Sequence, residues 1–203
     1  MKDDIIEFYV KNFEYLINPE NIDIDFVPPL VRRRMNRFDR IALFVMNKCM
    51  SKEIEYIVFS SFHGECERLF KLIEQYSSTK EVSPAIFSGS VHNYPLGLFL
   101  SNSGNAIPYT AICSGENSIS AGILTSVASK YDNVLFCYAD YHDDNIVSFA
   151  LNISKTPCQQ KFIINIQKKL NETDNFTDYI NFFSKKSTLL KYGTYKIERL
   201  KDD

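Results

Sequence analysis

The feature that most constrains the fold is a run of small residues between two short apolar segments. Residues 117–130 have the spacing of a helix, and residues 109–113 and 133–139 on either side have the composition of buried strands. Because small side chains let neighbouring elements approach closely, this helix is expected at the centre of the structure, although a tightly packed peripheral helix would share the pattern. The small residues are Ser118, Ser120, Ala121, Gly122, Ser126 and Ala128.

The rest of the chain alternates apolar strand segments with amphipathic helices. The prolines of residues 18–29 indicate a loop or an extended arm. The alternation predicts an α/β fold whose sheet is covered by helices on both faces. No repeat or linker divides the chain, so residues 1–203 are expected to form a single domain. Helices are expected over residues 5–16, 36–50, 65–76, 92–100 and 176–183, and further strands over 56–60, 146–153, 162–166 and 192–200.

Charge and cysteine content exclude several classes of protein. The formal net charge is −2, so there is no overall basic field to hold nucleic acid or a membrane surface. The amino terminus lacks a signal-peptide pattern and no apolar run reaches the ~18 residues that span a bilayer, so a cytoplasmic location is expected. The 5 cysteines have no CxxC spacing and read as free thiols. No phosphate-binding glycine loop is present, and no cofactor is expected.

Four motifs follow one another between residues 28 and 141. They are PLVRRRMNR at 29–37, FSSFHGE at 59–65, SPAIFSGSVHN at 83–93, and YTAICSGE at 109–116 with a partner strand that ends at Ala139-Asp140. In this order the chain resembles the N-terminal half of a β-ketoacyl synthase, and more closely the small stand-alone chain length factors of aryl polyene biosynthesis. The resemblance implies half of a thiolase-like fold, a single lobe with a mixed sheet covered by helices.

The resemblance also fixes where a nucleophile is expected. Condensing enzymes of this family carry a cysteine where a buried strand runs into the central helix, whose amino terminus lowers the pKa of the thiol. Counting back from helix 117–130 and strand 133–139, this position falls on Ile112. Cys113 is adjacent, but neighbouring residues of a strand point to opposite faces. The family's histidines belong to a second half that would follow residue 203, so the resemblance implies a non-catalytic chain length factor.

Two other functions stay open from the residues alone. A small acyltransferase or thioesterase would use Cys113 as nucleophile with His92 or His63 as base. A homodimeric scaffold or ligand-binding lobe would need neither group.

A metal site is not expected. The acidic run around His142 contains Asp140, Asp143 and Asp144, and an acidic turn between two strands accounts for these residues without a metal.

The resemblance further implies partners. A single lobe leaves apolar surface uncovered, which marks an obligate interface. The implied partner is a full-length β-ketoacyl synthase, which would carry the catalytic cysteine and histidines in a heterodimer. An acyl carrier protein would bind the complex transiently.

Two groups of residues are candidates for contact with substrate or partner. The segment that matches the family's acyl-tunnel gate is Ile86, Phe87, Ser88, Gly89 and Ser90. A bulky gate would limit chain length by steric exclusion, and the alternative is that Phe87 belongs to the core. The arginines either dock an acidic carrier protein or pair with carboxylates inside the fold or at an interface. They are Arg32, Arg33, Arg34 and Arg37.

Overall fold

The computed structural model describes residues 5–104, 106–142, 145–158, 160–166, 173–192 and 195–200. Its strands are β1 (Ile5–Ile17), β2 (Tyr56–Ser60), β3 (Tyr109–Ile112), β4 (Asn133–His142), β5 (Asn145–Ser154), β6 (Lys161–Ile166), β7 (Leu189–Tyr192) and β8 (Tyr195–Arg199). Its helices are α1 (Pro29–Arg32), α2 (Arg37–Cys49), α3 (Cys66–Thr79), α4 (Pro84–Gly89), α5 (Tyr94–Ser103), α6 (Ser118–Ala128) and α7 (Phe176–Phe183).

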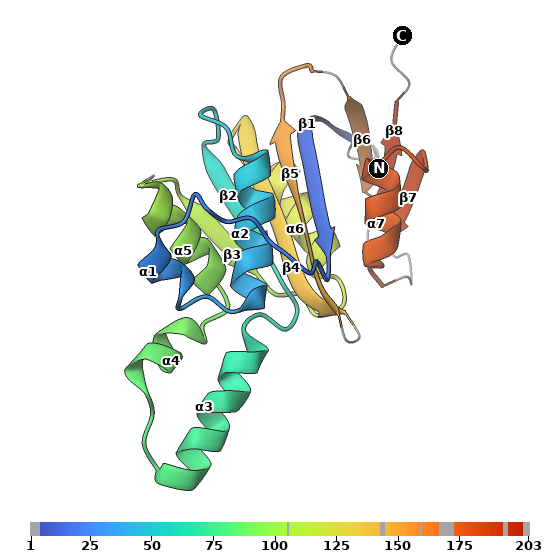
Figure 1. The fold of residues 1–203 in the computed structure, drawn as a ribbon. Helices are drawn as coiled ribbons and strands as arrows, with labels where there is room; N and C mark the ends of the chain where they lie inside the picture. Colours follow the sequence, from blue (N-terminus) through green and yellow to red (C-terminus); the bar gives the residue numbers. More distant parts are fainter. Residues whose placement is uncertain are drawn as a thin grey trace.

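The eight described strands form one mixed sheet in the order β3-β2-β4-β5-β1-β6-β8-β7 (Figure 1). Strand β2 runs parallel to β3 and to β4, and the remaining neighbours are antiparallel. Two hydrophobic clusters lie on the two faces of this sheet. One cluster holds α2 and α5, and the other holds α6 and α7. The predicted α/β sheet with helices on both faces is therefore confirmed.

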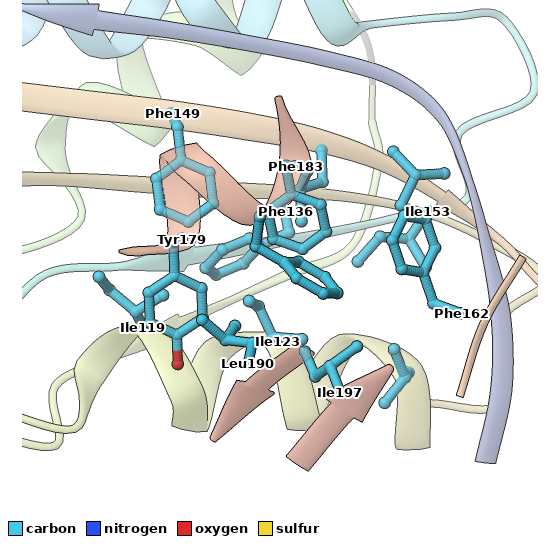
Figure 2. Close-up of a cluster of buried hydrophobic side chains, with 14 of the residues drawn as sticks. Ile119, Ile123, Phe136, Phe149, Ile153, Phe162, Tyr179, Phe183, Leu190 and Ile197 are labelled. Atoms are coloured by element: carbon cyan, nitrogen blue, oxygen red, sulfur yellow. The ribbon is translucent and has the colours of Figure 1, made fainter. Parts of the chain in front are cut away.

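The cluster between the sheet and helices α6 and α7 is built from large side chains of both helices and of the central strands (Figure 2). Phe149 of β5 lies at its centre, with its ring stacked on that of Tyr179 at a centroid distance of 6.2 Å. Ile119 and Ile123 of α6 approach from below in the same view. The burial of these apolar side chains is the main force that holds the layers together.

The small-residue helix packs as closely as the sequence predicts. A Cβ atom added at Gly122 of α6 would overlap the ring of Phe136 on β4 and lie 3.0 Å from the Cβ of Ser60 on β2. Only a glycine allows this approach. Helix α6 therefore lies directly over β2 and β4, at the centre of the parallel part of the sheet.

The expected helix over residues 5–16 is wrong, since these residues form strand β1. Phe8 and Val10 are buried in alternation on one face, but a bulge between Val10 and Asn12 shifts the register with β5. The bulge breaks the period-two pattern of apolar residues, and β-sheet partners on both sides override the local helical spacing. The expected strand over 192–200 is also different, because Leu189–Tyr192 and Tyr195–Arg199 are two antiparallel strands.

Helices α3 and α4 form an arm that projects from the sheet layers (Figure 1). Of the α3 side chains only Leu72 is buried. Helix α3 ends at Thr79, and the left-handed backbone conformation of the next residue, Lys80, turns the chain back toward α4. The arm is thus held to the rest of the chain mainly at its base, where α3 begins and α4 ends.

Candidate functional site

The candidate site is the edge of the sheet where three parallel strands end. Because β2 runs parallel to β3 and β4, the carboxyl ends of all three strands lie at the same edge. Ligand sites of open α/β sheets occur at such edges. The segments that meet here are Ser61–Glu65 after β2, Cys113–Asn117 after β3, and Asp140 in the last residues of β4.

The structure separates Ile112 and Cys113 as a strand requires. The Ile112 side chain is half-buried and packs against the hydrophobic cluster under α6. Its carbonyl accepts a hydrogen bond from the backbone N–H of Ser61 at 3.1 Å. Cys113 is exposed, and its Sγ donates to the carbonyl of Phe62 at 3.4 Å. Of these two residues, the one that packs against the cluster under α6 is Ile112, whose side chain has no nucleophilic atom.

The amino terminus of α6 is occupied by a carboxylate. Oδ2 of Asp174 accepts from the backbone N–H of Ser120 at 2.7 Å, and Oδ1 accepts from the hydroxyl of Tyr179 at 2.9 Å. Burial raises the pKa of Asp174, and its hydrogen bonds from the first turn of α6 oppose that rise. A helix amino terminus stabilises a nearby anion, and here the anion is Asp174. Sequence reasoning did not find this residue, because no local pattern connects it to α6.

A second buried carboxylate orients one of the histidines. The Asp140 side chain is 1% exposed and accepts from the backbone N–H groups of Phe62 at 2.6 Å and Tyr141 at 2.8 Å. His63 Nδ1 lies 2.8 Å from Asp140 Oδ1, and the hydroxyl of Tyr138 donates to Oδ2 at 3.0 Å. Asp140 therefore holds the loop after β2 in place. The sequence placed Asp140 at the end of a strand but gave no reason to pair it with His63.

His92 has a structural partner as well. Its Nε2 lies 2.9 Å from the carbonyl oxygen of Ser61, and its ring meets that of Phe59 edge-on. A Cβ at Gly64 would come within 2.9 Å of the His92 ring. Among the described residues, neither His92 nor His63 forms a hydrogen bond with the Cys113 thiol. These two histidines are instead held by Asp140 and by the carbonyl of Ser61.

Within the described residues, no group of three or more His, Cys, Asp or Glu side chains is arranged to hold a metal ion. Asp143 and Asp144, two members of the acidic run, lie outside the described residues.

The arginine run divides into two kinds of residue. Arg32 forms an ion pair with Asp25, and Arg37 donates to the carbonyl of Pro19 at 2.5 Å. These two contacts fix the loop of residues 18–29 against α1 and α2. Arg33 and Arg34 are exposed. In the described part of the chain their guanidinium groups form no hydrogen bond or ion pair.

The base of the α3–α4 arm contains a buried charge cluster. Arg68 lies 2.5 Å from Oδ2 of Asp39 and 2.9 Å from Oε1 of Glu65, and both carboxylates are fully buried. Asn36 donates to Oε2 of Glu65 at 2.9 Å. Burial and the neighbouring Asp39 raise the pKa of Glu65 to about 9, so that Glu65 is protonated at neutral pH. The cluster ties α3 to α2, because Arg68 of α3 bridges Glu65 and Asp39 of α2.

The candidate gate residues lie next to this cluster and point in different directions. Ile86 and Ser88 line a pocket of about 540 Å³ together with Arg34. Phe87 is 61% exposed, so it is not a core residue. The carbonyl of Gly89 accepts from Arg68 at 3.1 Å, and the hydroxyl of Ser90 donates to the carbonyl of Phe87 at 2.9 Å.

The arm presents large apolar side chains that its own chain does not cover. Four of them lie on α3 at helical spacing, and others follow in α4 and the adjoining loops. A soluble monomer rarely exposes so many neighbouring apolar groups. The exposed side chains are Leu69, Phe70, Ile73, Tyr76, Val82, Phe87 and Val91.

Strand β3 is a second feature that could pair with another chain, because it lies at the edge of the described sheet. It pairs with β2 on one side only, because it stands at the end of the sheet order. Tyr109 and Ala111 on this strand are exposed. An edge strand whose N–H and C=O groups are not covered is a template for pairing with another chain.

A mixed sheet with a central small-residue helix at the end of a buried strand defines one lobe of a thiolase-like fold. The chain belongs to the family described as the N-terminal domain of β-ketoacyl synthase, whose model matches residues 10–183.

Solved structures with this fold include ketosynthase complexes. A chain of the ketosynthase (ApeO) in complex with its chain length factor (ApeC) from Xenorhabdus doucetiae superposes with a TM-score of 0.72 at 14% identity. The match covers 97% of this chain and 100% of that chain. The ishigamide ketosynthase/chain length factor gives a TM-score of 0.55 at 12% identity, over 72% of this chain and 52% of that one. No curated protein matches the sequence significantly.

In the described part of the chain, no helix has the length and the apolar character to cross a membrane.

Proposed function

We propose that this chain is a non-catalytic chain length factor, which pairs with an active β-ketoacyl synthase and shapes the acyl tunnel in aryl polyene biosynthesis. The observation that carries the proposal is the junction between β3 and α6. The resemblance assigns the family's nucleophile position to Ile112, and the Ile112 side chain packs against the hydrophobic cluster under α6. The adjoining helix amino terminus, which would activate a thiol, binds the carboxylate of Asp174 instead.

The uncovered apolar surface supports the pairing. The exposed apolar side chains lie on α3 and α4, and β3 lies at the edge of the described sheet. A partner of the same fold has apolar surface and strand edges of the same kind, and obligate interfaces are more hydrophobic than transient ones. The solved complex of a ketosynthase with its chain length factor contains a chain of this fold and length.

In this proposal the partner performs the condensation and this chain limits the length of the product. Phe87 is the candidate gate residue, because it points out of its own chain and is bulky. A ring placed at the end of a tunnel in the partner would stop elongation by steric exclusion. The arginines at the surface, Arg33 and Arg34, would be available to an acidic carrier protein.

The test is co-expression with the ketosynthase encoded nearest to this chain, followed by size-exclusion chromatography and a condensation assay. We expect a heterodimer that elongates acyl chains and a partner that is inactive or insoluble alone. Phe70→Glu or Ile73→Glu should abolish the heterodimer, because each places a charge in the apolar surface of α3. Glu74→Lys, a charge change at an exposed position of the same helix, is the matched control and should leave assembly intact.

Two outcomes contradict the proposal. Full condensing activity of the ketosynthase in the absence of this chain would show that this chain has no role in the reaction. Loss of activity on Cys113→Ala, with the heterodimer preserved, would favour the acyltransferase or thioesterase alternative.

A further inference from the structure

The pocket at the base of the α3–α4 arm combines an unpaired cation with apolar walls. Its volume is about 540 Å³, within the range of small-molecule sites. Arg34 enters it from the turn between α1 and α2, and Ile86 and Ser88 enter from α4. Tyr94 closes it from the start of α5. With Arg68 and Lys71 of α3, four separate segments of the chain converge on one cavity.

Of the cations that line the pocket, Arg34 has no ion-pair partner among the described residues. Arg68 is bound to Asp39 and Glu65, and it stacks over the ring of Tyr94 at 4.6 Å. Lys71 is paired with Glu67 at 2.5 Å. The Arg34 guanidinium has no such partner in the described part of the chain, although its carbonyl accepts from Arg68 at 3.0 Å. Arg34 is therefore the cation of this pocket that is left to bind an anion.

The remaining walls suit an apolar group. Met35 is buried and Ile86 is half-buried, and both line the cavity beside Arg34. Tyr94 stays a neutral hydrogen-bond donor, because burial raises the pKa of its phenol. An arginine fork binds carboxylate and phosphate oxygens in pairs, and apolar walls favour a hydrocarbon chain.

We propose that this pocket binds an amphipathic anion, which is a carboxylate or phosphate group attached to an apolar chain. The anionic group would lie against Arg34, with the Tyr94 hydroxyl as a further donor. The chain would lie along Met35 and Ile86. This site is distinct from the junction of β3 and α6, and its test uses this chain alone, so that its failure and the failure of the proposed function can be told apart.

The experiment titrates the full chain with simple probes by isothermal calorimetry. Octanoate and octyl phosphate carry both a charge and a chain, acetate carries only the charge, and octanol only the chain. We expect saturable binding of octanoate or octyl phosphate, and at least about tenfold weaker binding of acetate and octanol. The tighter of the two amphipathic probes identifies the anionic group.

Variants then assign the binding to this pocket. Arg34→Ala should weaken octanoate binding by about tenfold, since it removes a charge-assisted hydrogen bond. Arg33→Ala is the matched control, because Arg33 is a neighbouring exposed arginine that does not line the pocket. Arg34→Gln keeps the bulk of the side chain, and it replaces Arg34→Ala if that variant does not fold.

Three results would overturn the inference. The first is equal weakening by Arg33→Ala and Arg34→Ala, which would indicate general surface charge. The second is octanol binding as tight as octanoate, which would leave no role for the cation. The third is no saturable binding of either amphipathic probe.

Discussion

Oδ2 of Asp174 accepts a hydrogen bond from the backbone N–H of Ser120 at 2.7 Å, so a residue from beyond β6 closes the amino terminus of α6. The same carboxylate accepts from Tyr179 of α7 at 2.9 Å. One side chain therefore joins the two helices that cover this face of the sheet. It also uses the helix terminus that an active condensing enzyme of this fold would direct at its nucleophile.

Asp174→Ala is expected to lower the free energy of unfolding by about 2 kcal/mol. The change removes a helix cap, which costs about 1 kcal/mol, and leaves the buried Tyr179 hydroxyl without this acceptor. Urea denaturation followed by circular dichroism measures the effect. Asp132→Ala, at an exposed position, is the control and should stay within ~0.5 kcal/mol of the wild type. Equal stability of the two variants would mean that the cap contributes nothing.

Gly122→Ala is expected to destabilise the chain by roughly 1–3 kcal/mol through overpacking. The new methyl group would overlap the Phe136 ring and press on Ser60, and neither can move without disturbing the sheet. Gly97→Ala in α5 is the matched control, because nothing lies within 4 Å of its Cβ position. That control should be neutral or stabilising by up to ~1 kcal/mol, since alanine favours a helix. Thermal denaturation of both variants distinguishes the two sites.

The stability of the chain should depend on pH through Glu65. Burial and Asp39 raise its pKa from 4.5 to about 9, so the folded state holds a proton that the unfolded state releases. Its contribution is fully present below pH 4.5 and is lost as the pH rises toward 9. The free energy of unfolding should fall over this window by at most ~1.4 kcal/mol per pH unit from this group.

Glu65→Gln isolates that contribution. Glutamine has nearly the same shape as the protonated acid and cannot ionise. The free energy of unfolding should therefore fall less steeply between pH 5 and 9. Urea unfolding at several pH values measures the slope. A variant that retains the full wild-type slope would assign the pH dependence to other groups.

Cys113 should react with iodoacetamide at the rate of an ordinary exposed thiol. It is accessible, but no histidine is hydrogen-bonded to it and Asp174 occupies the adjacent helix terminus. Cys137 should not react in the native state, because burial raises the pKa of its thiol to about 12. Mass spectrometry of timed samples at neutral pH measures both. Rapid and selective labelling of Cys113 would instead point to an activated nucleophile.

Patterns within a single element could be predicted from the sequence, and relationships between distant segments could not. The small residues of α6 predict its close packing, because composition alone limits how near a neighbour can come. Strand β1 could not be predicted in this way, since its bulge after Val10 and its two β-sheet partners are tertiary features. The contacts of Asp174 with α6 and of Asp140 with His63 join residues 54 and 77 positions apart, and no local pattern encodes them.

The candidate gate also shows which features a sequence pattern can predict and which it cannot. The motif around residues 86–90 marks a segment, but only the structure separates Phe87, which points outward, from Ile86, which lines a pocket. The sequence also did not reveal that Arg34 and Ile86 face the same cavity. Their proximity depends on how the α3–α4 arm folds back onto the turn before α2.

Phe87→Ala should lengthen the product of the reconstituted complex without preventing its assembly. The Phe87 side chain is 61% exposed, so its removal leaves no cavity in this chain and the fold should be unaffected. If the ring closes the far end of the partner's tunnel, its loss leaves room for further elongation. The measurement is the mass distribution of products formed by the purified heterodimer. Val82→Ala, which also removes an exposed apolar group from the arm, is the control and should leave product length unchanged. Identical product distributions for Phe87→Ala and the wild type would remove Phe87 from the gate.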